Sequence, residues 1–161
     1  MEEKSDLENL KEDYLEVQTK YNLPSFEKLN EDFQIEKIAE IETDFLLREI
    51  RKFIADKFSN YLRFIENILN PANVPIFIFS IIKSIGVDEK KKLTNIYKKL
   101  AKMEIELIEL DVEFLEEKEV EFVKESYAVW QEIKKDALEV VGVIKKNWDH
   151  KVEVNGKNYF G

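Results

Sequence analysis

Residues that could carry out chemistry are few in this chain. The one histidine, His150, follows Asp149, an arrangement that could orient an imidazole to activate a serine. It stands between the predicted end of a long helix and the tail, where no element is expected to hold such a geometry. A surface histidine near a helix C-terminus, favoured by the helix dipole, is the simpler interpretation. We therefore expect no catalytic residue here.

Several other kinds of site are excluded by composition. The chain has no cysteine, which excludes disulfides, thiolate metal sites and a cysteine nucleophile. One histidine is too few for a typical zinc site or for the histidine pair of a di-iron bundle. The four glycines are never clustered, so no phosphate-binding loop can be drawn. We predict a non-enzymatic protein with no cofactor, metal site or small-molecule ligand. A carboxylate-only Mg²⁺ enzyme is left open, because such sites use oxygen ligands.

The clearest charge pattern is a lysine-rich stretch followed by an acidic one. Residues 83–102 hold seven lysines against two acids, and residues 104–121 hold nine acids against one lysine. If the chain turns back near residue 115, the lysines face residues 130–145, which hold Lys134 and Lys135. A solvated face is the ordinary interpretation. The functional alternative is a basic end that contacts RNA or an acidic partner through Lys90, Lys91, Lys92, Lys98, Lys99 and Lys102.

A second feature is the apolar run from Val74 to Ile82, with Pro75 suited to the first turn of a short helix. Because this helix, predicted over 75–85, is apolar nearly all round, we expect it to be buried. The alternative is an exposed patch for a partner, formed by Ile76, Phe77 and Phe79.

These residues must be positioned by helices. Ser5 to Glu8 read as a capping box that opens an N-terminal helix. Long helices are predicted over 34–69 and from Asp88 onward. The apolar seam of the second alternates three and four residues, as in a coiled coil: Leu93, Ile96, Leu100, Met103, Leu107, Leu110 and Phe114.

The register of that seam slips after Phe114. One helix of about 60 residues with a stutter, or a turn within residues 111–117, would explain the slip. We favour the turn, because globular helices far beyond 25 residues are rare. In the tail, 151–161, apolar and polar residues alternate around Asn155-Gly156, and this pattern predicts a β-hairpin. The predicted fold is all-α: one domain over 1–150, an antiparallel bundle of long helices at 34–69, 88–112 and 117–147, with shorter helices and a small hairpin.

Length and charge support this picture. A chain of 161 residues suits one domain, and few glycines and prolines with 37% charged residues are typical of helical proteins. A net charge of −9 opposes binding of the whole chain to nucleic acid or anionic lipid. No apolar run approaches the roughly 20 residues of a membrane span. Since the N-terminus is also acidic rather than signal-like, we expect a soluble, cytoplasmic protein.

Two stretches, Leu23 to Asn30 and Trp130 to Lys135, resemble segments of uncharacterised helical proteins from small-genome archaea. The resemblance implies a cytosolic helical protein and assigns no functional residue. Together with the residues above, it favours a binding or scaffold protein whose partner is another protein or a second copy of itself. The alternative is an accessory protein of an RNA or ribonucleoprotein assembly that uses the lysine-rich end.

Overall fold

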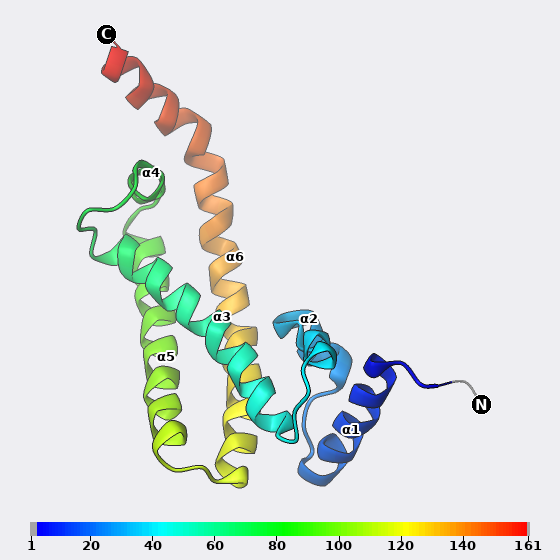
Figure 1. The fold of residues 1–161 in the computed structure, drawn as a ribbon. Helices are drawn as coiled ribbons and strands as arrows, with labels where there is room; N and C mark the ends of the chain where they lie inside the picture. Colours follow the sequence, from blue (N-terminus) through cyan, green and yellow to red (C-terminus); the bar gives the residue numbers. More distant parts are fainter. Residues whose placement is uncertain (1–2, 161) are drawn as a thin grey trace. The chain divides into compact units, whose positions relative to one another are not determined.

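The chain is helical nearly throughout the part that the structure describes. This computed structural model describes the backbone of residues 3–160 and the side chains of residues 3–148. None of these residues lies in a strand, so the all-α fold class is confirmed. The elements, coloured along the chain in Figure 1, are α1 Asp6–Tyr21, α2 Phe26–Phe33, the 3-10 helix η1 Ile35–Glu40, α3 Leu46–Leu69, α4 Ile76–Ser84, α5 Val87–Val112 and α6 Glu116–Phe160.

The residues group into two compact units. Unit 1 contains Met1–Phe58 and Met103–Val129, and unit 2 contains Ser59–Lys102 and Trp130–Gly161. Helices α3, α5 and α6 supply residues to both units, whereas α4 belongs to unit 2 alone. The single domain over 1–150 stays a prediction. Within the described residues, no helix is long and apolar enough to cross a membrane.

The core of each unit consists of the apolar stripes that the sequence predicts. In unit 1, Tyr14, Leu29, Ile50 and Phe58 are completely buried. The seam of α5 is buried from Leu93 to Leu110, while Phe114 lies beyond the helix end and is 46% exposed. Because burial of such side chains is the main favourable term in folding, this seam is what holds α5 in place.

The capping box at the start of α1 is confirmed. The backbone N–H of Glu8 donates to Ser5 Oγ at 3.2 Å, and the N–H of Ser5 donates to Glu8 Oε2 at 2.9 Å. The helix ends at Asn22, whose φ of 55° is left-handed. Ser25 then caps α2 by accepting the N–H of Lys28 at 3.3 Å.

The prediction of one long helix over 34–69 is wrong for the first third of that range. Gln34 has a φ of 53°, which ends α2 and separates it from η1, and α3 begins only at Leu46. Local side chains favour these breaks. The side-chain amide of Asn30 donates to the Glu36 carboxylate and accepts the backbone N–H of Glu36. Thr43 Oγ accepts the N–H of Phe45 at 3.0 Å. Asn and Thr compete with helical hydrogen bonding in this way.

The predicted turn between two long helices is confirmed. Helix α5 ends at Val112 and α6 begins at Glu116, within the range expected from the slip in the apolar seam. Across the turn, Lys118 Nζ donates to Glu109 Oε1 at 2.6 Å, and this hydrogen bond raises the pKa of Lys118. The bond joins the last turn of α5 to the first turn of α6. The turn itself contains no glycine or proline.

The C-terminal hairpin predicted over 151–161 is wrong for residues 151–160, which continue α6 as a helix. Two physical reasons explain the difference. An isolated hairpin is marginal in water without further strands to pair with. A helix that already exists extends without a new nucleation cost, so adding residues to α6 is favoured over starting a turn.

Candidate protein-binding surface

Helix α4 buries three of its side chains and leaves three apolar side chains exposed to solvent. The buried residues are Ile78, Ile81 and Ser84. The expectation that the whole helix is buried is wrong, because Ile76 is 85% exposed, Phe77 59% and Phe79 46%. These three residues are the ones that the sequence singles out as an alternative partner patch. We call them the α4 patch.

Contacts with α6 fix how α4 lies within unit 2. The side-chain amide of Asn147 donates to the backbone carbonyl of Ser84 at 3.0 Å, and Ser84 Oγ donates to the carbonyl of Ser80 at 2.8 Å. The rings of Phe77 and Trp148 lie 5.9 Å apart at an angle of 55°. Ser84 is completely buried, so both hydrogen bonds lie in the contact between α4 and α6.

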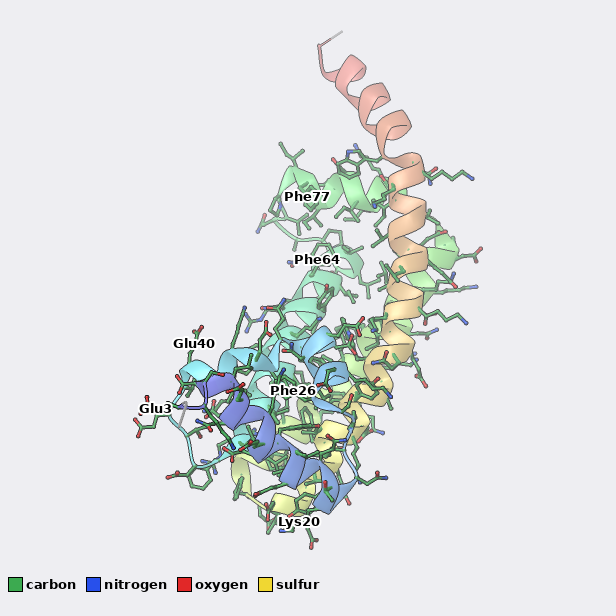
Figure 2. All side chains as sticks on the ribbon, turned by 90° about the vertical axis from the view of Figure 1, so that its right-hand side faces the viewer. Glu3, Lys20, Phe26, Glu40, Phe64 and Phe77 are labelled. Carbon is green, nitrogen blue, oxygen red and sulfur yellow. The ribbon has the colours of Figure 1, made fainter. Side chains whose placement is uncertain are left out.

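An open apolar groove of about 490 Å³ lies beside the α4 patch. Three helices of unit 2 line it, and Figure 2 labels Phe64 of α3 and Phe77 of α4, which lie on its wall. The remaining lining residues are Ile81 of α4 and Val141, Ile144, Lys145 and Trp148 of α6. Along α6 the groove extends over about 10 Å, at 1.5 Å per residue. Leu138, which is 68% exposed, stands one turn before Val141 and lengthens the apolar surface.

The charge around this groove is basic. Lys145 lines it, and Lys83 and Lys146 are exposed on the helices that form it. Unit 2 as a whole contains 14 lysines and arginines against 8 acids, a net charge of +6. An apolar groove with this surrounding favours a ligand that combines apolar side chains with carboxylates.

The six candidate lysines are exposed or half-buried on α5, and two of them pair with acids of α6. Lys92 bonds Glu139 at 2.5 Å and Lys99 bonds Glu132 at 2.8 Å, both on α6. The first bond raises the pKa of Lys92 and lowers that of Glu139. Lys102 is exposed and also takes part in an interaction. Lys90, Lys91 and Lys98 are exposed without an ion pair among the described residues.

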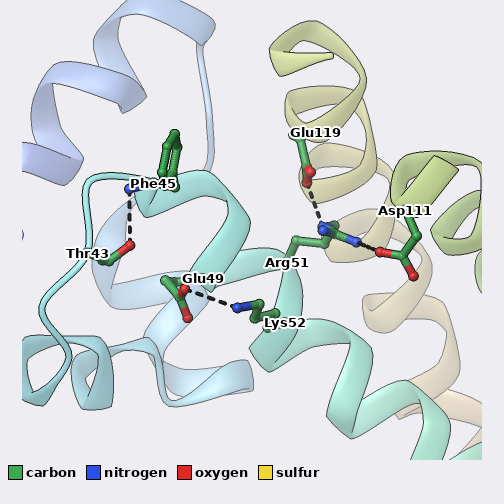
Figure 3. A network of polar contacts seen from close by, with 7 residues as sticks. All are labelled: Thr43, Phe45, Glu49, Arg51, Lys52, Asp111 and Glu119. Atoms are coloured by element: carbon green, nitrogen blue, oxygen red, sulfur yellow. Dashed lines mark hydrogen bonds and ion pairs between the residues drawn. The ribbon is translucent and has the colours of Figure 1, made fainter. Parts of the chain in front are cut away.

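Unit 1 holds a buried ion pair that the sequence analysis missed. Arg51 of α3 lies 2.8 Å from Asp111 Oδ1 and 2.9 Å from Glu119 Oε2 (Figure 3). Burial raises the pKa of Glu119, and this effect outweighs the attraction of Arg51, which lowers it. Glu119 is completely buried and Asp111 is exposed, so the guanidinium joins an interior carboxylate to a surface one.

A sequence signal for this pair exists. Glu119 lies four residues before Val123 and eleven before Trp130, so it falls on the apolar stripe of α6. Arg51 likewise precedes Ile54 and Phe58 by three and seven residues. A charged residue on each of two facing stripes predicts a buried pair. In the described part of the chain, no group of three or more metal-binding side chains comes together.

The spacing of apolar residues alone favours core stripes for the residues of the groove. Phe64 widens the stripe of α3, and Ile144 and Trp148 continue that of α6. These side chains line an open groove because of the way α4 packs in unit 2, which the sequence does not show. His150 lies outside the described side chains. Comparisons of the chain with protein-family models, with curated proteins and with solved structures give no match.

Proposed function

We propose that this chain is a non-enzymatic binding or scaffold protein that receives an amphipathic helix with acidic flanks in the groove of unit 2. The observation that carries the proposal is the exposure of the α4 patch beside an open apolar groove. Apolar surface of this kind, rimmed by charge, is typical of protein-binding sites. The antiparallel bundle of three long helices and a cytoplasmic location belong to the same proposal.

A helix suits this groove because three helices line it and its apolar residues follow one another along α6. An amphipathic helix places anchors at positions i, i+3 and i+7 into such a groove. Acidic flanks suit it because Lys145 stands at the wall. A partner that covers the exposed ring of Phe77 and the half-buried ring of Trp148 would remove apolar surface from water.

The test uses three synthetic helical peptides of about 15 residues, long enough to cover the groove at 1.5 Å per residue. One carries apolar anchors at i, i+3 and i+7 with glutamate flanks, the second carries lysine flanks, and the third has the anchors scrambled. Fluorescence anisotropy measures the binding of each. We expect the acidic peptide to bind most tightly and the scrambled peptide not to bind.

A matched pair of variants locates the site. Phe77→Asp should weaken binding of the acidic peptide by tenfold or more, since a buried Phe contributes roughly 1.5–3 kcal/mol. Leu15→Asp changes an equally exposed apolar residue of unit 1 and should leave binding unchanged. Equal affinities of these two variants, or no binding of any peptide, would reject the proposed site.

The alternative function, contact with RNA, is supported by the exposure of Lys90, Lys91 and Lys98. Phosphate contacts by these lysines predict binding to a labelled single-stranded RNA that falls steeply with salt. Substituting all three by glutamine would abolish that binding and leave peptide binding unchanged. RNA binding that survives the triple substitution would remove this alternative.

A further inference from the structure

Helix α5 has a second apolar face, which unit 1 leaves exposed. Ile105 is 66% exposed, Ile108 62% and Val112 83%. Their spacing of three and four residues places them on one side of the helix, away from the buried seam of Met103, Leu107 and Leu110. We call Ile105, Ile108 and Val112 the α5 stripe.

Carboxylates flank the α5 stripe. Glu104 precedes Ile105, Glu109 follows Ile108 and Asp111 precedes Val112. Glu109 and Asp111 each bond one cation, Lys118 and Arg51. Unit 1 as a whole contains 11 lysines and arginines against 26 acids, a net charge of −15. The stripe is therefore an apolar surface in a strongly negative surrounding.

The α5 stripe has the chemistry that the groove of unit 2 requires. It offers anchors at i, i+3 and i+7 on a helix, and they extend over about 10 Å, the same length as the groove along α6. Its surrounding is acidic where that of the groove is basic. We propose that the groove of one molecule binds the α5 stripe of a second copy of this chain. This inference rests on the proposed function, for which it names the partner.

Such an interface is heterologous, because each copy uses two different surfaces. One copy offers its α5 stripe to a second, whose own stripe stays available to a third. Contacts of this type produce rings if the rotation closes and open chains if it does not. Three anchors and a short groove make a small interface, and interfaces of this size are transient. Assembly should therefore increase continuously with protein concentration.

Sedimentation velocity on the full chain tests this assembly over a range of concentrations. The wild-type protein should show a mass that increases with concentration. Ile108→Asp removes the stripe but keeps the groove, and Phe77→Asp removes the groove but keeps the stripe. Each variant alone should stay a monomer. Leu15→Asp, the control, should assemble as the wild type does.

Mixing the two variants gives the decisive result. The groove of Ile108→Asp and the stripe of Phe77→Asp are both intact, so their mixture should form one-to-one dimers and nothing larger. Dimers in the mixture would also show that both variants are folded, which circular dichroism checks independently. A mixture that stays monomeric while the wild type assembles would overturn the inference.

Two other results would also overturn it. If the wild type stays monomeric at every concentration, a second copy is not the partner of the groove. If Ile108→Asp assembles like the wild type, the α5 stripe is not the surface that the groove binds. The acidic peptide then separates the two proposals. If it still binds to Ile108→Asp, the groove function stands and only the identity of the partner is wrong. If it does not bind, the proposed function fails as well.

Discussion

Units 1 and 2 bury similar apolar stripes but differ in where they place charge. Unit 1, with a net charge of −15, buries an ion pair between Arg51 and Glu119. Unit 2, with a net charge of +6, keeps its ion pairs at the surface, where Lys92 and Lys99 bond Glu139 and Glu132. We therefore expect charge to affect folding in the first unit and, under the proposed function, binding of a partner in the second.

The largest expected effect comes from breaking the buried pair. Arg51→Met leaves the carboxylate of Glu119 buried without its cation, which costs about 3–5 kcal/mol of stability. Lys99→Met in unit 2 removes only a surface pair and should cost less than about 1 kcal/mol. Equilibrium unfolding in urea measures both. Equal losses of unfolding free energy in the two variants would contradict the view that the buried pair of unit 1 matters more for stability than the surface pairs of unit 2.

The pH dependence of the Arg51→Met defect sharpens the same comparison. Since burial raises the pKa of Glu119, the folded state keeps the proton of this carboxyl group up to a higher pH than the unfolded chain does. The contribution of Glu119 is then complete at low pH and is lost as pH rises through the raised pKa. Without Arg51 that pKa is higher still.

We therefore expect the loss of stability in Arg51→Met to be smallest near pH 4 and to grow toward pH 7. Unfolding free energies of the variant and the wild type at several pH values measure this difference. The surface variant Lys99→Met serves as the control. A defect of Arg51→Met that is the same at every pH would show that Glu119 does not cause it.

The smallest expected effect concerns recognition by unit 2. Lys145→Glu should weaken binding of the acidic helical peptide about two- to fivefold, because an exposed ion pair contributes about 0.2–1 kcal/mol. The same variant should bind the lysine-flanked peptide more tightly than the wild type does. Anisotropy titrations at low and high salt measure the change, which salt should reduce. Identical affinities for both peptides would show that charge plays no part.

Periodicity predicted the core well because buried stripes repeat every three or four residues. The seam of α5 and the turn after it follow from spacing alone, since the register changes where the chain reverses. The break before Leu46 was missed, because the side-chain bonds of Asn30 and Thr43 interrupt the helix without a proline or glycine. The tail was misread as a hairpin because an Asn-Gly pair is a local signal that the long helix α6 overrides.

The candidate site was predictable only in part. The sequence identified Ile76, Phe77 and Phe79 as an alternative partner patch. The sequence of an apolar helix does not show, however, how much of its surface the rest of the protein covers. The lysines were identified individually, yet their partners Glu132 and Glu139 lie more than 30 residues away along the chain. Such pairing depends on the register between α5 and α6, which composition does not encode.

The pair of Arg51 and Glu119 also bears on the uniqueness of the fold. Leucine and isoleucine seams look alike after a shift of one helical turn, so apolar packing alone permits several registers between two helices. A buried guanidinium and carboxylate meet in one register and are left unpaired in the others. We expect a chain with both residues replaced by methionine to fold at least as stably but to sample alternative alignments of α3 and α6. We therefore expect this polar contact, despite its cost in stability, to select one structure among several similar ones.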